Sequence, residues 1–302
     1  MSQTVMRSRT RSRASGRSGQ PTGGYNWVMT HATEGTTACG PFVMRWQETG
    51  PADAPLLVLL HGIYAGAHGY EWRELVPHLS DRFRVRVPDL LGSGDSDRPD
   101  LEYTRAVVQG AVDALILDAG AEAHVVASSL TGAYALRSVV AGAPVRALTL
   151  ITPTGLGAHR EHEPNGAVRA LYSVARHSPV GDLLVDALTS APSVRWFQTN
   201  KTYRDPSVLH DDELVETRRA GRLTNAKHLQ LAFVFGRLAI DLSPEDVEQV
   251  RPTVIWARAQ QFVDQAEADR WRAAGAHVVE LDSGLPQVEE PAVVADVIAG
   301  AA

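Results

Sequence analysis

The sequence has a single cysteine and no long apolar run, and these two shortages exclude several classes of protein. The single cysteine, Cys39, rules out an internal disulfide framework and predicts a reducing compartment, with Cys39 as a small apolar residue of an early strand. No stretch approaches the roughly 20 apolar residues that span a bilayer. The formal net charge of -6 argues against a nucleic-acid surface. We therefore expect a cytoplasmic globular protein that binds neither nucleic acid nor membrane.

Recognisable metal and nucleotide motifs are also missing. His159 and His162 form an H-x-x-H pair without a convincing third ligand, and the acidic residues around them are typical of a solvated surface. Gly92 and Gly94 form a G-x-G that lacks the third glycine and the receiving helix of a dinucleotide fingerprint. We therefore expect no metal and no cofactor.

The chain divides into a tail, a core and an insertion. Residues 1–24 are rich in arginine and serine with no acidic residue, which predicts a disordered tail. Residues 25–154 and 251–302 alternate short β-branched runs with helical stretches, the pattern of an α/β fold with a mostly parallel sheet flanked by helices. Residues 155–250 have helical periodicity and exceed an ordinary crossover, which predicts a helical lid. The predicted strands are 42–48, 56–60, 83–87, 124–128, 147–152, 253–256 and 277–281.

Three motifs follow predicted strands. An apolar strand ends in His61-Gly62 and leads into a glycine-rich loop that begins at Ile63 and Tyr64. Residues 88–99 read PDLLGSGDSDRP, a strand end followed by a turn-rich segment. Residues 124–136 read HVVASSLTGAYAL, a strand that breaks at Ser128-Ser129 and becomes a helix, and such a turn exposes the Ser129 side chain.

In order and spacing, these motifs together with RPTVIWA at residues 251–257 resemble the α/β-hydrolase superfamily over about residues 40–300. The resemblance places Ser129 at the nucleophile position and implies an oxyanion hole from the backbone N–H groups of Ile63 and Leu130. Ala127 and Thr131 stand where the family usually has glycines. An alternative is that Ser129 only caps the following helix.

The other two positions of the triad differ from the family. Gln260 stands where the resemblance implies the acid, and Leu285 stands where it implies the histidine. A serine hydroxyl needs a positioned base, and loss of that base typically removes about three to four orders of magnitude from acyl transfer. Asp264 is a replacement candidate for the acid. A histidine in a new position is a second alternative, from His68, His159 or His162.

Aromatic and apolar residues of the predicted lid indicate an apolar ligand. Trp196 and Phe197 are the candidate walls of a pocket above the serine. The pocket residues that we predict are Tyr64, His68, Ser128, Trp196, Phe197, Gln260 and Leu285.

Three functions fit these residues. The first is a non-hydrolytic enzyme that uses the oxyanion hole and an enclosed apolar pocket for cyclisation, elimination or rearrangement of a carbonyl-containing small molecule. Members of the superfamily with altered triads include lyases and cyclases of secondary metabolism, so the resemblance implies a role in bacterial secondary metabolism such as antibiotic biosynthesis. The second is an esterase or thioesterase with a relocated histidine. The third is a non-catalytic small-molecule binding protein. The sequence leaves the substrate and the oligomeric state open.

Overall fold

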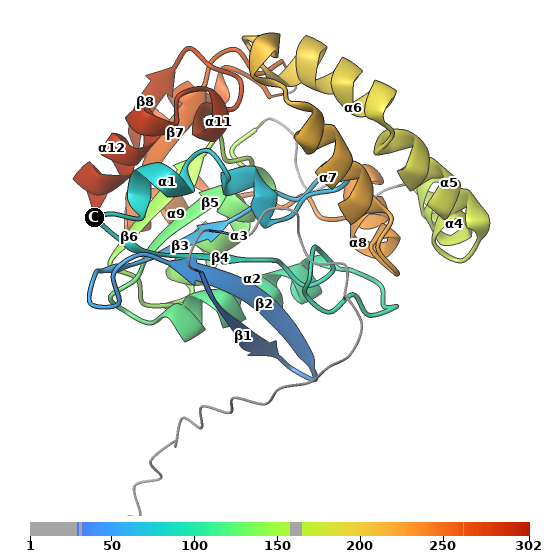
Figure 1. The fold of residues 1–302 in the computed structure, drawn as a ribbon, viewed down its shortest axis with the longest axis horizontal. Helices are drawn as coiled ribbons and strands as arrows, with labels where there is room; N and C mark the ends of the chain where they lie inside the picture. Colours follow the sequence, from blue (N-terminus) through green and yellow to red (C-terminus); the bar gives the residue numbers. More distant parts are fainter. Residues whose placement is uncertain (1–28, 30–31, 158–164, 262) are drawn as a thin grey trace, which may run out of the picture.

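The computed structural model describes residues 29, 32–157, 165–261 and 263–302, which form a layered molecule around an eight-stranded sheet (Figure 1). The strand order is β1-β2-β4-β3-β5-β6-β7-β8. Strands β1 and β2 pair antiparallel at one edge, and β3 to β8 are parallel. The predicted tail, residues 1–24, lies outside the described residues. So do His159 and His162.

The predicted strands are confirmed, each with its ends within one residue of the prediction. The structure adds β1, which is not among the predicted strand ranges. Its last residue is the half-buried Cys39, and the expectation that Cys39 lies in an early strand is thus confirmed. The strands are β1 (Thr33–Cys39), β2 (Phe42–Thr49), β3 (Leu56–Leu60), β4 (Arg84–Pro88), β5 (His124–Ser128), β6 (Ala147–Ile151), β7 (Thr253–Ala257) and β8 (His277–Leu281).

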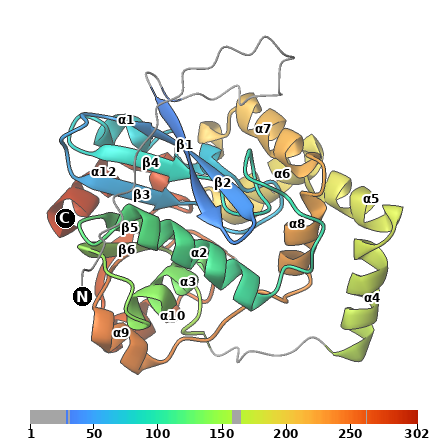
Figure 2. The ribbon, with the colours of Figure 1, turned by 90° about the horizontal axis from the view of Figure 1, so that it is seen from below.

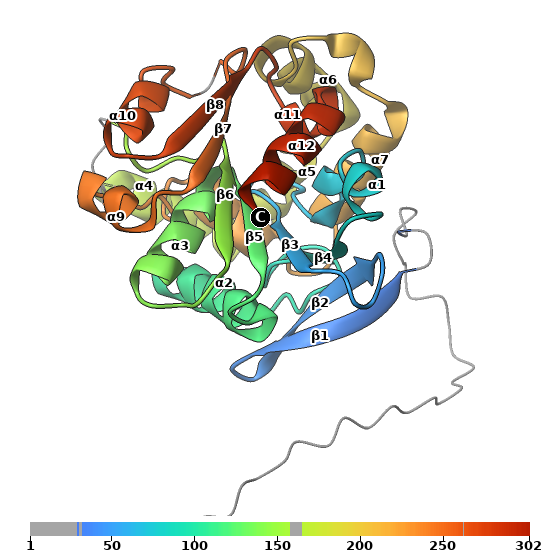
Figure 3. The ribbon, with the colours of Figure 1, turned by 90° about the vertical axis from the view of Figure 1, so that its left-hand side faces the viewer.

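Helices cover both faces of the sheet (Figure 3). Because successive side chains of a strand point to opposite faces, Val58 and Leu60 of β3 pack with one helical layer, whereas Leu57 and Leu59 pack with the other. The first layer contains α2 (Arg105–Ala119), α3 (Ser129–Val140), α9 (Pro244–Val250) and α10 (Glu267–Ala273). The second contains η1 (Gly69–Trp72), α1 (Val76–Leu79) and α12 (Pro291–Ala301).

The segment predicted as a lid is helical and, up to α8, lies to one side of the sheet (Figure 2). Its last helix, α9, packs against α3 and α10. Among the described residues, no helix is both long enough and apolar enough to cross a membrane. The helices of the segment before α9 are α4 (Gly166–Arg176), α5 (Pro179–Leu188), α6 (Ala191–Phe197), η2 (Gln198–Thr202), η3 (Pro206–Val208), α7 (Asp211–Gly221) and α8 (Lys227–Val234).

A buried ion pair joins this helical segment to the sheet domain. Arg73, directly after η1, donates from Nη2 to Glu213 Oε2 of α7 at 2.8 Å, and the two side chains are only 7% and 6% exposed. The hydroxyl of Tyr203 donates to the same carboxylate at 2.8 Å. The Gln198 amide donates to the other oxygen at 2.8 Å. The carboxylate is therefore well hydrogen-bonded, which is the condition for a buried ion pair to hold.

We expect Glu213→Gln to destabilise the protein by up to about 3 to 5 kcal/mol, because it removes the buried partner of Arg73. Among the described residues, only Glu74, which is 43% exposed, then remains as an ion-pair partner, at 3.4 Å from the Arg73 Nε. Thermal and urea unfolding measure the change. Asp211→Asn is the matched control. Asp211 lies in α7 like Glu213 and pairs with Arg195 of α6, but its side chain is 87% exposed. That control should change stability by less than about 1 kcal/mol. Equal losses in both variants would contradict the role of the buried pair.

Candidate active site

A cavity of about 430 Å³ lies between the carboxyl ends of the central strands and the helical segment. This volume is in the range of small-molecule sites. Both the sheet side and the helical segment contribute polar groups, and the apolar walls come chiefly from the helical segment. The lining includes Ile63, Tyr64, His68, Glu71, Arg73, Ser128, Ser129, Ile151, Thr152, Leu188, Val194, Phe197, Gln198, Glu213, Phe233, Val234, Gln260, Leu285 and Gln287.

Ser129 stands at the turn between β5 and α3 and lines this cavity. Its φ of 52° is in the left-handed region that side chains rarely adopt, which costs roughly 1 to 2 kcal/mol. Backbone strain of this kind persists only where the surroundings hold it, and it gathers at functional sites. Among the described residues, the Ser129 hydroxyl makes no hydrogen bond.

Two glycines, Gly62 and Gly132, lie beside the turn at Ser129. A methyl group at Gly62 would lie 3.4 Å from the Ser129 Cβ, and one at Gly132 would lie 3.4 Å from the Ala127 carbonyl oxygen. Thr131, which stands where the resemblance implies a glycine, donates its hydroxyl proton to the His61 carbonyl at 2.7 Å. The threonine therefore ties the turn to the loop after β3.

His61 connects the two loops that follow β3 and β4. Its Nδ1 donates to the Gly62 carbonyl at 2.7 Å, and its Nε2 accepts from the Leu90 N–H at 3.1 Å, which fixes a neutral tautomer. Burial lowers the pKa of His61 to about 4, with a smaller contribution from His68. The ring is thus a structural link that is neutral at physiological pH.

Sequence reasoning missed Glu71, a carboxylate of η1 that lines the cavity and is only 4% exposed. Its Oε2 accepts from the Gly62 N–H at 2.9 Å and from the Tyr64 hydroxyl at 3.3 Å. Its Oε1 accepts from the Gln287 amide at 2.9 Å. Burial raises the pKa of Glu71, although hydrogen bonds from Ser128, Gly62, Gln287 and Tyr64 oppose the rise.

Most of the predicted pocket residues line the cavity. They are Tyr64, His68, Ser128, Phe197, Gln260 and Leu285. Trp196 is the exception: it is 58% exposed and is not part of the lining. Adjacent residues of a helix point about 100° apart, so α6 turns Phe197 toward the cavity and Trp196 toward solvent.

The residues at the implied acid and histidine positions are engaged through their backbones. The Gln260 carbonyl accepts from the Gln265 side chain at 2.8 Å, and the Leu285 N–H donates to the Glu289 carboxylate at 2.7 Å. Asp264, the replacement candidate for the acid, pairs with Arg270 at 2.8 Å and accepts from the Ala266 N–H. Those contacts are the ones expected of a surface residue before a helix.

Both ring nitrogens of His68 face partners other than the serine. Nδ1 lies 3.0 Å from the Gly66 carbonyl, and Nε2 lies 3.6 Å from Glu216 Oε2. The pKa of Glu216 is lowered, because hydrogen bonds from His68 and Arg219 outweigh the opposing effect of burial.

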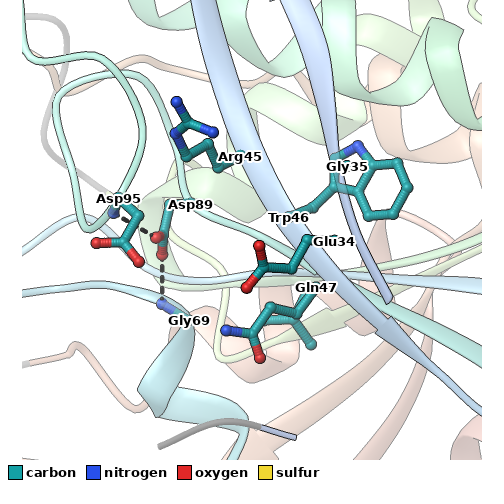
Figure 4. Close-up of a pocket in the computed structure, with 9 residues that line it drawn as sticks. Glu34, Gly35, Arg45, Trp46, Gln47, Gly69, Asp89 and Asp95 are labelled. Atoms are coloured by element: carbon teal, nitrogen blue, oxygen red, sulfur yellow. Dashed lines mark hydrogen bonds between the residues drawn. The ribbon is translucent and has the colours of Figure 1, made fainter. Parts of the chain in front are cut away.

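A second, smaller cavity of about 60 Å³ lies beside β1 and β2 and holds several acidic residues (Figure 4). Its central carboxylate, Asp89, accepts from the Gly69 N–H at 2.8 Å and the Asp95 N–H at 2.7 Å. Burial raises the pKa of Asp89 to about 6. These contacts join the loop after β4 to η1, the helix that carries Glu71 of the larger cavity.

Within the described residues, no group of three or more His, Cys, Asp or Glu side chains could hold a metal ion.

Comparison with known proteins points to one family. A family model described as "Alpha/beta hydrolase family" matches residues 57–297. A crystal structure of a serine hydrolase involved in carbazole degradation superposes with a TM-score of 0.69 at 19% identity, covering 89% of this chain and 98% of that chain. At that identity the likeness shows the fold.

Two curated relatives match over shorter stretches. The magnesium-chelatase 30 kDa subunit of Rhodobacter capsulatus is 57% identical over 71 residues, which are 24% of this chain and 24% of that protein. The cis-3-alkyl-4-alkyloxetan-2-one decarboxylase of Xanthomonas campestris pv. campestris is 49% identical over 57 residues, 19% of this chain and 18% of that protein. The chain thus matches about a quarter or less of the length of these relatives.

We expect Ser129→Gly to be more stable than Ser129→Ala by about 1 kcal/mol, because glycine adopts a positive φ without the steric cost that alanine pays. Both variants lack the hydroxyl, so the difference isolates the backbone strain. Thermal unfolding measures it. An alanine variant as stable as the glycine variant would show that the turn is unstrained.

We expect His61 to make stability fall as the pH drops from about 6.5 to about 4. The unfolded chain binds a proton below its ordinary pKa of 6.5, whereas the native ring does so only near pH 4. The effect is about 3 kcal/mol by the size of this shift. Urea unfolding at pH 7.5 and pH 4 should show the advantage of the wild type over His61→Gln shrinking by that amount. Parallel pH dependences would contradict it.

Proposed function

Because this chain belongs to the alpha/beta hydrolase family, we propose that it is an enzyme of that fold that does not hydrolyse its substrate. In the proposed reaction the cavity encloses an apolar, carbonyl-containing small molecule, and the backbone N–H groups of Ile63 and Leu130 polarise its carbonyl. Cyclisation, elimination or rearrangement follows. Bacterial secondary metabolism is the proposed setting.

The observation that carries the proposal is the isolation of the Ser129 hydroxyl. It lines the cavity and has no hydrogen-bond partner among the described residues, whereas a nucleophilic serine needs a base within reach of its proton. Gln260 and Leu285, at the implied acid and base positions, also line the cavity, and neither side chain accepts a proton at neutral pH.

The form of the cavity supports a reaction that depends on binding and polarisation. Phe197, Phe233 and Val234 supply apolar walls from the helical segment. Such walls exclude water and hold a flexible ligand in a reactive conformation, which lowers the entropic part of the barrier. Preorganised N–H donors act more strongly there than in water. The short match to a decarboxylase is in keeping with non-hydrolytic chemistry.

An esterase with a relocated histidine is the competing function. The observation in its favour is a curated relative, the 2-hydroxy-6-oxo-6-phenylhexa-2,4-dienoate hydrolase of Burkholderia cepacia, which is 28% identical over 261 residues, 78% of this chain and 84% of that protein. The competing function requires a histidine to reach Ser129, and the two candidates besides His68 lie outside the described residues.

We expect the purified protein to hydrolyse p-nitrophenyl butyrate no faster than Ser129→Ala, and to label weakly with a serine-reactive fluorophosphonate. A spectrophotometric assay and intact-protein mass spectrometry measure these. Saturable turnover that disappears in Ser129→Ala and in one of the His68, His159 or His162 variants would establish the rearranged hydrolase instead.

We expect the native substrate to accumulate in a strain that lacks the gene, and comparison with the parent strain by mass spectrometry identifies it. Incubated with the purified protein, that compound should convert without an adduct on Ser129 under single-turnover conditions. Ser129→Ala should retain activity, since loss of one neutral donor costs at most about 2.7 to 4 kcal/mol of transition-state stabilisation. A compound returned unchanged would indicate a binding protein.

A further inference from the structure

Glu71 lies where three parts of the chain meet at the wall of the cavity. It is held by Gly62 and Tyr64 of the loop after β3 and by Gln287 of α11 (Pro286–Glu289), which is 216 residues away in sequence. A methyl group at Gly62 would lie 3.4 Å from the Ser129 Cβ and 3.5 Å from Glu71 Oε2. The carboxylate and the serine are therefore neighbours across a single glycine.

Gln287 can form a hydrogen bond with the Glu71 carboxyl group in either of its protonation states. Its side chain is fully buried, its amide nitrogen donates to Glu71 Oε1, and its amide oxygen has no partner among the described residues. An amide carries both a donor and an acceptor. By rotating, Gln287 can donate to an ionised Glu71 or accept from a protonated one. An apolar residue at this position would serve neither state.

The other titratable groups of the cavity leave Glu71 to act alone. The other titratable residues among those that line the cavity are Tyr64, His68, Tyr70, Arg73 and Glu213. The charge of Arg73 is balanced by Glu213 at 2.8 Å. His68 is directed at Gly66 and Glu216.

We propose that Glu71 is the general base and acid of this cavity, and that its substrates are carbonyl compounds with an acidic C–H next to the carbonyl group. This inference rests on the proposed function and adds the group that moves the proton. In the ionised state, Glu71 removes the proton from the α carbon, and the electron pair of the broken C–H bond moves into the carbonyl group to form an enolate.

The enolate oxygen is bound by the N–H groups of Ile63 and Leu130. The carboxylic acid then returns its proton to a carbon or to a leaving oxygen, which restores the ionised Glu71 and balances the step. Of the hydrogen bonds to Glu71, the one from Tyr64 is the longest at 3.3 Å, and Tyr64 is 37% exposed, so it is the contact that a substrate displaces.

The environment of Glu71 also raises its affinity for a proton. Burial raises the pKa of Glu71 above its ordinary value of 4.5. A stronger base results, because the ionised form is less favoured in the enclosed site. Since the ionised form removes the proton, the rate should rise with pH through this raised pKa and then level off.

The test uses phenylacetone in D2O, whose benzylic protons exchange for deuterium when an enolate forms. NMR follows the exchange, and saturation-transfer spectra of the same samples show whether phenylacetone binds. The wild type should accelerate the exchange. Glu71→Gln should lose about 100-fold or more of that acceleration, and the rising limb of the pH profile with it. Glu71→Asp should recover part of both.

Glu267→Gln is the matched control. Glu267 is also a buried carboxyl group, with its pKa raised by burial to about 7, but it lies in α10 and does not line the cavity. The Glu267→Gln variant should accelerate the exchange of phenylacetone as much as the wild type does. Thermal unfolding of every variant confirms that the fold is retained.

The outcomes separate the two proposals. Exchange that is as fast in Glu71→Gln as in the wild type would overturn the role of Glu71 and leave the proposed function standing. Phenylacetone that binds to the wild type without accelerated exchange would overturn the proposed carbonyl polarisation itself, and the inference with it. Exchange lost in Glu71→Gln and kept in Ser129→Ala supports both.

Discussion

The left-handed backbone at Ser129 is the constraint on which the rest of this site depends. A residue with a φ of 52° turns the chain from β5 directly into α3 and brings a side chain into the cavity. The turn is held from two sides, by the central position of β5 in the sheet and by the hydrogen bond from Thr131 to His61. Gly62 lies directly beside the turn, where an added methyl group would be at van der Waals contact distance from the Ser129 side chain. The strain is thus balanced by contacts from β3, β5 and α3 together.

The enclosure of the cavity depends on a different contact. Arg73 and Glu213 join the sheet domain to α7, and both line the cavity that they help to close. Burial beneath the helical segment lowers the effective dielectric constant around the polar groups of the cavity, which strengthens the electrostatic interactions between them. The same burial raises the pKa of Glu71. The helical segment and the proton affinity of the site are therefore physically linked.

The sequence predicted the parts of this structure that local pattern determines. The buried strands were found because each is a short β-branched run, whereas β1 was missed because Thr33–Cys39 is polar and contains a glycine at Gly35. That strand is stabilised by pairing with β2, which a local pattern does not reveal. Phe197 and Trp196 are adjacent and equally aromatic, so only the orientation of α6 could separate the one that lines the cavity.

Glu71 was not predicted from the sequence, for a related reason. It lies in a short helical turn without a motif, and a glutamate in such a turn is ordinarily solvated. Its burial comes from tertiary contacts, above all from Gln287 near the other end of the chain. The sequence did contain an indirect indication. Because Gln260 and Leu285 stand at the acid and histidine positions, any proton transfer requires another titratable group in the pocket.

The charge of Glu71 bears directly on which chemistry the cavity supports. The carboxylate lies within about 7 Å of the Ser129 side chain, and at an effective dielectric constant of 20 it would repel an oxyanion there by roughly 2 to 3 kcal/mol. A serine attack that sends its proton to another group would place two negative charges in one enclosed site. Proton removal by Glu71 avoids this, because the negative charge moves from the carboxylate to the substrate oxygen and is never doubled. The Ser129 hydroxyl makes no hydrogen bond to Glu71, whereas Glu71 lines the cavity and so faces whatever fills it. The arrangement therefore favours proton transfer from the substrate over activation of the serine.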